Sequence, residues 1–220
     1  QGYLEQAKEV FTKLDMTSEL SWLETQYGQV LFKAGQLFKA EAVLESARTK
    51  AAEQAFVSWE MRAEEYLALI LVERGELEKA KTLSHKLLTK SQLANNLWLE
   101  ARALTVLSRV SFARSELFQA KKSLHESLSI ISDLQNIPSI LYRLTCDLQL
   151  QLVANELVTA SRLYGFLNQT EILDKFVYTD RQLFRTVTDP FLDMFEQNAL
   201  LLKDWQTLTL QEVVTLILND

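Results

Sequence analysis

Two histidines supply the imidazole groups of this chain, and they lie 40 residues apart, at His85 and His125. An imidazole can act as a general base or bind zinc, but either role needs further groups at fixed distances. The chain has one cysteine, Cys146, and no third histidine to complete a zinc site. The sequence therefore predicts no metal site, and it places both histidines at surface or inter-repeat packing positions.

Other catalytic patterns are weak. Carboxylates are plentiful, as in Glu60, Glu64 and Glu65, but on helices they are typical of a solvated face. No Gly-x-Ser-x-Gly turn exposes a serine nucleophile, and no glycine-rich loop could hold phosphate. We therefore expect no enzyme activity and no cofactor within these residues, and a binding role is the class that remains.

The composition favours a long helical chain. The 220 residues include only 5 glycines and 2 prolines, which is too few for a turn-rich β-sandwich or barrel. The net charge of -6 argues against direct nucleic-acid binding by this segment. The densest apolar run, 67–72, is too short to cross a membrane. A single cysteine agrees with a reducing compartment, so we expect a cytoplasmic location, and the opening Gln1-Gly2-Tyr3 suggests a piece of a longer protein.

A 40-residue repeat organises most of the chain. Shifting the sequence by that length aligns a leucine column, an alanine column and a column of residues suited to left-handed turns. A fixed period of this size is typical of stacked helical hairpins. The columns are Leu37, Leu77, Leu117 and Leu157; Ala40, Ala80, Ala120 and Ala160; and Gly35, Gly75, Ser115 and Asn155.

Each repeat is predicted to be two helices joined by a tight turn. A small residue recurs in the first helix, at Gly28, Ala68 and Ser108, and would let the second helix approach closely. The expected helices cover 3–14, 18–34, 36–54, 57–74, 76–92, 95–113, 116–134, 138–154 and 156–173.

Together with Ala47, which lies seven positions after Ala40, these residues resemble the tetratricopeptide repeat. The resemblance covers about four and a half units, over residues 1–173. It implies an all-α, right-handed superhelix of antiparallel helix pairs, a TPR-like α-solenoid.

Residues 174–220 lose the period, and we expect them to form an atypical C-terminal helical cap over the last repeat. Asp189 before Pro190 predicts a helix start with Asp189 as N-cap. Thr209 and Glu212 have the spacing of a capping box. The apolar stripe of the following helix is expected to pack on the repeats.

In such a superhelix the first helix of each pair lines the concave side. Counting from the small-residue column defines rows of side chains on that inner face. Arginine and aromatic side chains in these rows suit a protein, an extended peptide, an acidic segment or a small effector such as a sugar-like ligand. The predicted contact residues are Trp22, Thr25, Gln29, Arg62, Glu65, Arg102, Thr105, Arg109, Tyr142, Thr145 and Gln149. Packing between units and pairing with nearby acids remain the alternatives for these side chains.

The end of the chain resembles a family of bacterial regulators. The matching segments are Ala160-Ser161-Arg162-Leu163-Tyr164-Gly165, Asp180-Arg181-x-x-Phe184 and Leu208-Thr209-Leu210-Gln211-Glu212. They are similar to the closing motifs of AfsR- and MalT-like (LuxR-type) signal-transduction ATPase regulators. The resemblance implies a sensor region whose nucleotide-binding module lies upstream in the same chain.

These patterns favour a non-catalytic sensor or interaction domain of a multidomain bacterial transcriptional regulator. Such a domain would bind a protein, a peptide or a small effector on its concave face. The alternative is a structural adaptor or oligomerisation module that binds no effector.

Overall fold

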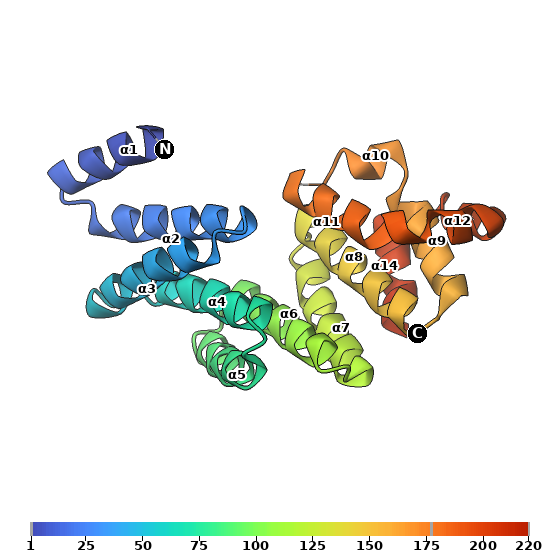
Figure 1. Ribbon diagram of the computed structural model, residues 1–220, viewed down its shortest axis with the longest axis horizontal. Coiled ribbons are helices and arrows are strands. Elements are labelled where there is room, and N and C mark those ends of the chain that lie inside the picture. The colour runs from blue at the N-terminus through green and yellow to red at the C-terminus, as the bar shows by residue number, and fades with distance from the viewer. Residues whose placement is uncertain (1, 177, 220) are drawn as a thin grey trace. The chain divides into compact units, whose positions relative to one another are not determined.

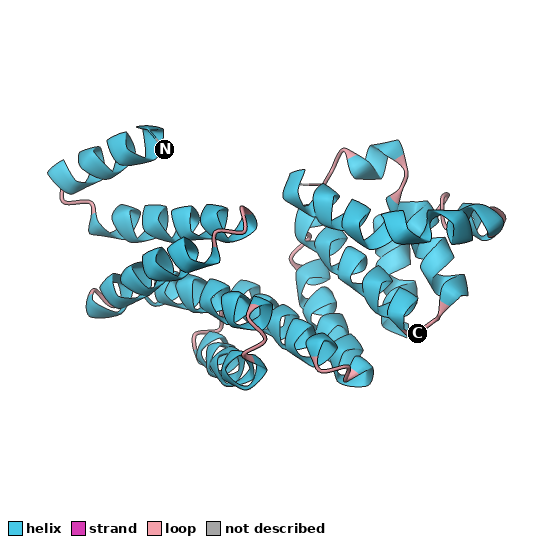
Figure 2. Ribbon diagram, viewed as in Figure 1, coloured by secondary structure: helices cyan, strands magenta, loops and turns pink. Residues whose placement is uncertain are grey.

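The computed structural model describes residues 2–176 and 178–219, and helices are the only regular elements within them (Figure 2). The chain divides into two compact units, residues 1–113 and 114–220. The first unit contains α1 (Gly2–Lys13), α2 (Thr17–Lys33), α3 (Leu37–Glu53), α4 (Val57–Glu73), α5 (Leu77–Leu93) and α6 (Leu97–Ala113), labelled in Figure 1. The second contains α7 (Leu117–Asp133), α8 (Ile137–Val153), α9 (Leu157–Leu167), α10 (Thr170–Leu173), α11 (Tyr178–Thr188), the 3₁₀ turn η1 (Asp189–Phe191), α12 (Leu192–Gln197), α13 (Leu201–Asp204) and α14 (Leu210–Asn219).

Helices α2 to α8 follow a strict backbone period. Each has 17 residues, and they begin at residues 17, 37, 57, 77, 97, 117 and 137, a step of 20. The predicted ranges for α1 to α8 agree with the observed bounds within two residues. Two consecutive steps make the 40-residue sequence repeat.

Left-handed residues produce this step. Gly35 has φ 71° and ends α2 with a Schellman motif, in which the Gln36 amide donates to the Leu31 carbonyl at 2.9 Å. The predicted turn residues Gly75, Ser115 and Asn155 also have positive φ. The alternate turns, which the sequence did not single out, do the same at Asp15 (54°), Ala55 (57°), Asn95 (48°) and Gln135 (53°).

The prediction of one helix over 156–173 is wrong. Helix α9 ends at Leu167, Gln169 has an extended backbone with ψ 139°, and α10 begins at Thr170. An extended residue cannot continue the i to i−4 hydrogen bonds of an α-helix. The break turns the chain so that Leu167 and Ile172 are both buried.

Within the first unit, successive helices pack against one another from α1 to α6. The alanine column lies at the tightest points, because Ala40, Ala80, Ala120 and Ala160, across both units, are fully buried. Gly28 likewise permits close packing of α2, since a Cβ there would lie 2.5 Å from the Leu44 side chain of α3. The first unit is thus an all-helical array consistent with a repeat solenoid.

In the second unit, α7, α8 and α9 continue the repeat, and the C-terminal helices pack directly on them. Helix α14 lies against α7, α11 against α8, and α13 against α9. The expected apolar stripe is formed by Val213, Val214 and Ile217, which are buried. The boundary between compact units therefore falls inside the region expected as 1–173, and the last repeats share a unit with the helices of 174–220.

The capping box expected at the start of α14 is confirmed. The Thr209 amide donates to Glu212 Oε2 at 2.7 Å, and the Glu212 amide donates to Thr209 Oγ1 at 3.3 Å. Asp189, in contrast, is not an N-cap: it is the first residue of η1, and Thr188 precedes it without a side-chain cap. The chain enters α12 through this 3₁₀ turn, so the cap position falls one residue earlier than predicted.

Aromatic side chains fill the space between α9 and the C-terminal helices. The ring of Tyr164 stacks on Phe195 with centroids 3.9 Å apart, and on Phe184 at 5.9 Å.

No helix in the described part of the chain combines the length and apolar character that crossing a membrane requires.

Candidate functional site

The first helices of the repeats bring several predicted contact residues together in the first unit. Arg102 of α6 reaches across to α4, where its Nε and Nη2 each lie 2.5 Å from an oxygen of Glu65. Arg62 Nη1 donates to the same carboxylate at 3.0 Å, and its Nη2 lies 3.5 Å from Gln29 Oε1 in α2. Four of the eleven predicted residues therefore form one connected network across α2, α4 and α6.

Aromatic rings complete this group. The guanidinium of Arg62 lies 5.5 Å from the ring centroid of Tyr66, and that of Arg102 lies 5.8 Å from Tyr66 and 5.5 Å from Trp98. These distances are typical of cation–π contacts. We call Arg62, Glu65, Tyr66, Trp98 and Arg102 the arginine cluster.

The cluster is only partly covered. The side chains of Arg62 and Arg102 keep 13% and 19% of their surface exposed, whereas that of Glu65 keeps 4%. Burial raises the pKa of Tyr66 above its ordinary value, although the charge of Arg102 acts in the opposite direction. The phenol is therefore neutral at physiological pH and accepts a hydrogen bond from Arg102 Nη2 at 3.1 Å.

Charge is unbalanced in the cluster. Two guanidinium groups face one carboxylate, so the cluster has an excess of one positive charge within a chain of net charge -6. A guanidinium is planar and presents five N–H groups in a fixed fork, a geometry that matches the oxygens of a carboxylate. The arrangement is chemically suited to bind a carboxylate or an acidic segment.

Arg109 extends this surface along α6. Its Nη2 lies 2.5 Å from Glu73 Oε1 at the end of α4, and both side chains are partly exposed, at 31% and 41%. Trp22, in the same predicted row as Arg62 and Arg102, is 40% exposed on α2.

The predicted threonines have a different role. Thr25, Thr105 and Thr145 are buried, and each hydroxyl donates to the backbone carbonyl four residues earlier, at 2.8, 2.9 and 3.0 Å. A hydroxyl bonded to its own helix and removed from solvent has no surface to offer a partner. These three residues pack within the fold.

Tyr142, Thr145 and Gln149 belong to α8 in the second unit. Tyr142 and Gln149 are half-buried there. The arginine cluster, in contrast, consists of residues of the first unit alone.

The two histidines have unlike surroundings. His85 is exposed on α5, whereas His125 Nε2 lies 2.9 Å from Oδ1 of the fully buried Asp147 in α8. Within the described ranges, no three His, Cys, Asp or Glu side chains gather in a way that would hold a metal ion.

The carboxylates considered for acid–base chemistry are held by cations. Lys90 Nζ lies 2.6 Å from Glu60 and 3.0 Å from Glu64, and Glu65 belongs to the arginine cluster. Burial acts to lower the pKa of Lys90, but hydrogen bonds to Glu60 and Glu64 outweigh it and leave that pKa raised. The ion pairs of Lys90 with Glu60 and Glu64 link α5 to α4.

Tyr66 and Glu73 were not predicted from sequence to belong to this surface. Trp98, near the start of a first helix, was expected to pack between repeats; it does so against the buried cluster around Met61, and it also contacts Arg102. The available signal was helical spacing, because Tyr66 follows Arg62 by four residues and Trp98 precedes Arg102 by four. Residues four apart share a helix face, so an arginine and an aromatic ring at that spacing can stack.

Comparisons of this chain with protein-family models and with curated proteins find no match.

Proposed function

We propose that the first unit is a non-catalytic interaction domain that binds an acidic segment of a protein or peptide along α4 and α6. The observation that carries this proposal is the arginine cluster, in which two stacked guanidinium groups share one buried carboxylate. An incoming carboxylate would find pre-positioned donors there, and preorganised donors reduce the ordering cost of binding.

The surroundings of the cluster support a peptide rather than an isolated ion. Trp22 on α2 adds partly exposed aromatic surface to that of Trp98, and Arg109 adds a second cation along α6. Aromatic and arginine side chains are enriched at the energetic centres of interfaces. An extended segment that alternates acidic and apolar side chains would use both kinds of group.

In the wider setting, we place this domain in a multidomain bacterial transcriptional regulator of the AfsR- and MalT-like type. The helical repeats would form a right-handed, TPR-like superhelix in the cytoplasm, and partner binding would bias an upstream nucleotide-binding module. The supporting observations are the 40-residue register and the closing sequence motifs.

Fluorescence anisotropy can test the proposal with two labelled eight-residue peptides, one alternating Glu and Phe and the other alternating Lys and Phe. We expect the acidic peptide to bind at least about tenfold more tightly, since one mispaired charge at an interface is worth on the order of 1.4 kcal/mol. Arg109→Gln should weaken binding of the acidic peptide about fivefold. It should change the stability of the fold little, because the Arg109–Glu73 ion pair is exposed.

Arg48→Gln is the matched control. Arg48 lies on α3, is 36% exposed and pairs with Glu45, so the substitution removes the same charge from a helix outside the proposed surface. Equal binding of both peptides, or an equal loss from Arg48→Gln and Arg109→Gln, would contradict the proposal.

A structural adaptor or oligomerisation module is the second candidate, and exposed apolar residues on and next to α1 favour it. Val10 is 50% and Leu14 is 64% exposed. Sedimentation velocity across a hundredfold range of concentration separates the two functions. A self-association that Val10→Ser with Leu14→Ser abolishes would support the adaptor, and a monomer at every concentration would exclude it.

A further inference from the structure

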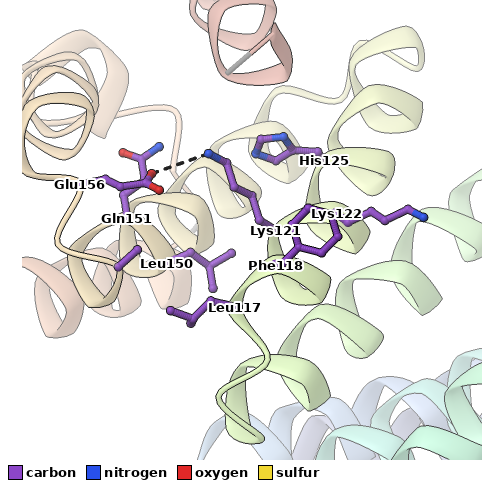
Figure 3. Close-up of a pocket in the computed structure, with 9 residues that line it drawn as sticks. Leu117, Phe118, Lys121, Lys122, His125, Leu150, Gln151 and Glu156 are labelled. Carbon is purple, nitrogen blue, oxygen red and sulfur yellow. Dashed lines mark ion pairs between the residues drawn. The ribbon is translucent and has the colours of Figure 1, made fainter.

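A pocket of about 500 Å³ lies in the second unit, between α7 and the end of α8 (Figure 3). Its volume is within the range of small-molecule sites, which combine an apolar wall with a few polar groups that fix the orientation of the ligand. The apolar lining residues are Leu117, Phe118, Leu150 and Ala154, and the polar ones are Lys121, Lys122, His125, Gln151 and Glu156. The polar groups therefore decide which class of apolar molecule the pocket selects.

Gln151 is a lining residue with an unfilled hydrogen-bond acceptor. Only 2% of the residue is exposed, and among the described residues its Oε1 has no hydrogen-bond partner. A buried acceptor of this kind is unfavourable, because it has lost its hydrogen bonds to water and gained none from the protein. A donor brought in by a ligand would offset that loss.

Asp147 fixes the orientation of the Gln151 amide. The amide Nε2 donates a hydrogen bond to Asp147 Oδ2, and Asp147 is fully buried. Turning the amide over would set its carbonyl oxygen against a carboxylate oxygen, and two acceptors cannot form a hydrogen bond with each other. Oε1 is therefore the atom without a partner, and it cannot exchange places with Nε2.

Asp147 is held on its other side by His125. The Nε2–H of His125 donates to Asp147 Oδ1 at 2.9 Å, because a carboxylate accepts hydrogen bonds. Both carboxylate oxygens thus have a partner from the pocket wall. Side chains linked in this way keep Gln151 in one position before a ligand arrives, which lowers the ordering cost of binding.

The charged lining residues do not favour an ion of one sign. Lys121 Nζ lies 3.6 Å from Glu156, the pair marked by the dashed line in Figure 3, so the wall has charges of both signs. Lys122 is exposed, and its side chain extends away from that pair. An uncharged ligand avoids the cost of moving an ion from water to an apolar wall.

We infer that this pocket binds a small, uncharged, apolar molecule that donates one hydrogen bond to Gln151 Oε1. The donor is an N–H or O–H group, and the apolar body lies against Leu117, Phe118 and Leu150. The site consists of residues of the second unit alone, so the inference stands whether or not the surface on α4 and α6 binds a peptide.

Indole and 1-methylindole test the hydrogen bond, because 1-methylindole has a methyl group in place of the N–H donor. A pocket without an acceptor would favour 1-methylindole, which buries more apolar surface. In an NMR titration of the 220-residue chain, we expect indole to shift amide resonances of residues 117–125 and 150–156, with a dissociation constant on the order of 1 mM. 1-Methylindole should bind at least about tenfold more weakly, since it leaves the buried acceptor unpaired. Equal affinities, tighter binding of 1-methylindole or no shift in these segments would overturn the inference.

Gln151→Met tests the acceptor itself, because methionine has a similar length and no carbonyl oxygen in its side chain. In this variant 1-methylindole should bind at least as tightly as indole. Gln149→Met is the matched control: Gln149 is half-buried on α8 and does not line the pocket, so the preference for indole should remain. A preference for indole that survives Gln151→Met would reject Gln151 as the acceptor. Circular dichroism confirms that each variant is folded, and the comparison of the two ligands in the wild type decides the inference if Gln151→Met is not.

Discussion

Arg102 and Glu65 form a bidentate ion pair between α6 and α4, with both nitrogen–oxygen distances at 2.5 Å. The two residues are 37 positions apart, so the pair joins the first helices of consecutive repeats. Glu65 is nearly buried, and it also pairs with Arg62. One carboxylate therefore holds both guanidinium groups of the candidate surface in place.

Glu65→Gln should destabilise the first unit by about 3 kcal/mol, because it leaves two partly buried guanidinium groups without their counter-charge. The measurement is urea unfolding followed by circular dichroism. Glu73→Gln is the control: the Arg109–Glu73 pair is 31% and 41% exposed, so its loss should cost less than about 1 kcal/mol. Similar losses for the two variants would mean that the buried pair gives no particular stability.

Ala55→Gly should stabilise the chain by about 0.5–1 kcal/mol. Ala55 is exposed and has φ 57°, a conformation that costs a residue with a Cβ about 1–2 kcal/mol and glycine almost nothing. Ala94→Gly provides the matched control, because Ala94 has φ -84° at the end of α5 and should lose about 0.5–1 kcal/mol. Thermal unfolding of both variants measures the difference, and a destabilising Ala55→Gly would show that the turn does not carry this strain.

The turns explain how far the backbone could be predicted from sequence. Gly35, Gly75 and Asn155 favour left-handed φ, so the ends of α2, α4 and α8 could be predicted. Ala55 and Gln135 have no such preference, and helix packing on both sides imposes their conformation. The sequence therefore indicates a 40-residue period where the backbone has a 20-residue one.

The candidate site was predictable only in part. Counting along the helix placed Arg62, Glu65 and Arg102 on one face, and the structure joins them. The same counting selected Thr25 and Thr105, which are buried. Periodicity identifies the face of a helix. Burial also depends on how far the neighbouring helix covers each edge of that face, and a single sequence does not contain that information.

Gly165→Ala should detach α13 from α9. The Leu202 carbonyl of α13 occupies the position that a Cβ at Gly165 would need, and a backbone cannot move aside as a side chain can. We expect a loss of about 3 kcal/mol, with faster amide exchange in α13 and α14. In Gly28→Ala the new Cβ meets the Leu44 side chain instead, so a loss nearer 1 kcal/mol is expected. Equal exchange rates in α13 before and after the Gly165 substitution would contradict this account.

The capping box of α14 should make its stability depend on pH. Hydrogen bonds from the backbone and hydroxyl of Thr209 lower the pKa of Glu212 in the folded chain. A lowered folded-state pKa means that the contribution is complete above the unfolded value, near 4.5, and is lost as the pH falls through the folded value. Glu212→Ala should therefore destabilise α14 at pH 7 and make little difference at pH 3. Glu212→Gln keeps an acceptor that does not titrate, so in this variant the contribution of position 212 to the stability of α14 should be the same at both pH values. Amide exchange in α14 measures its stability in each variant. If wild type and Glu212→Ala differ in that stability by the same amount at pH 7 and pH 3, the carboxylate charge is not involved.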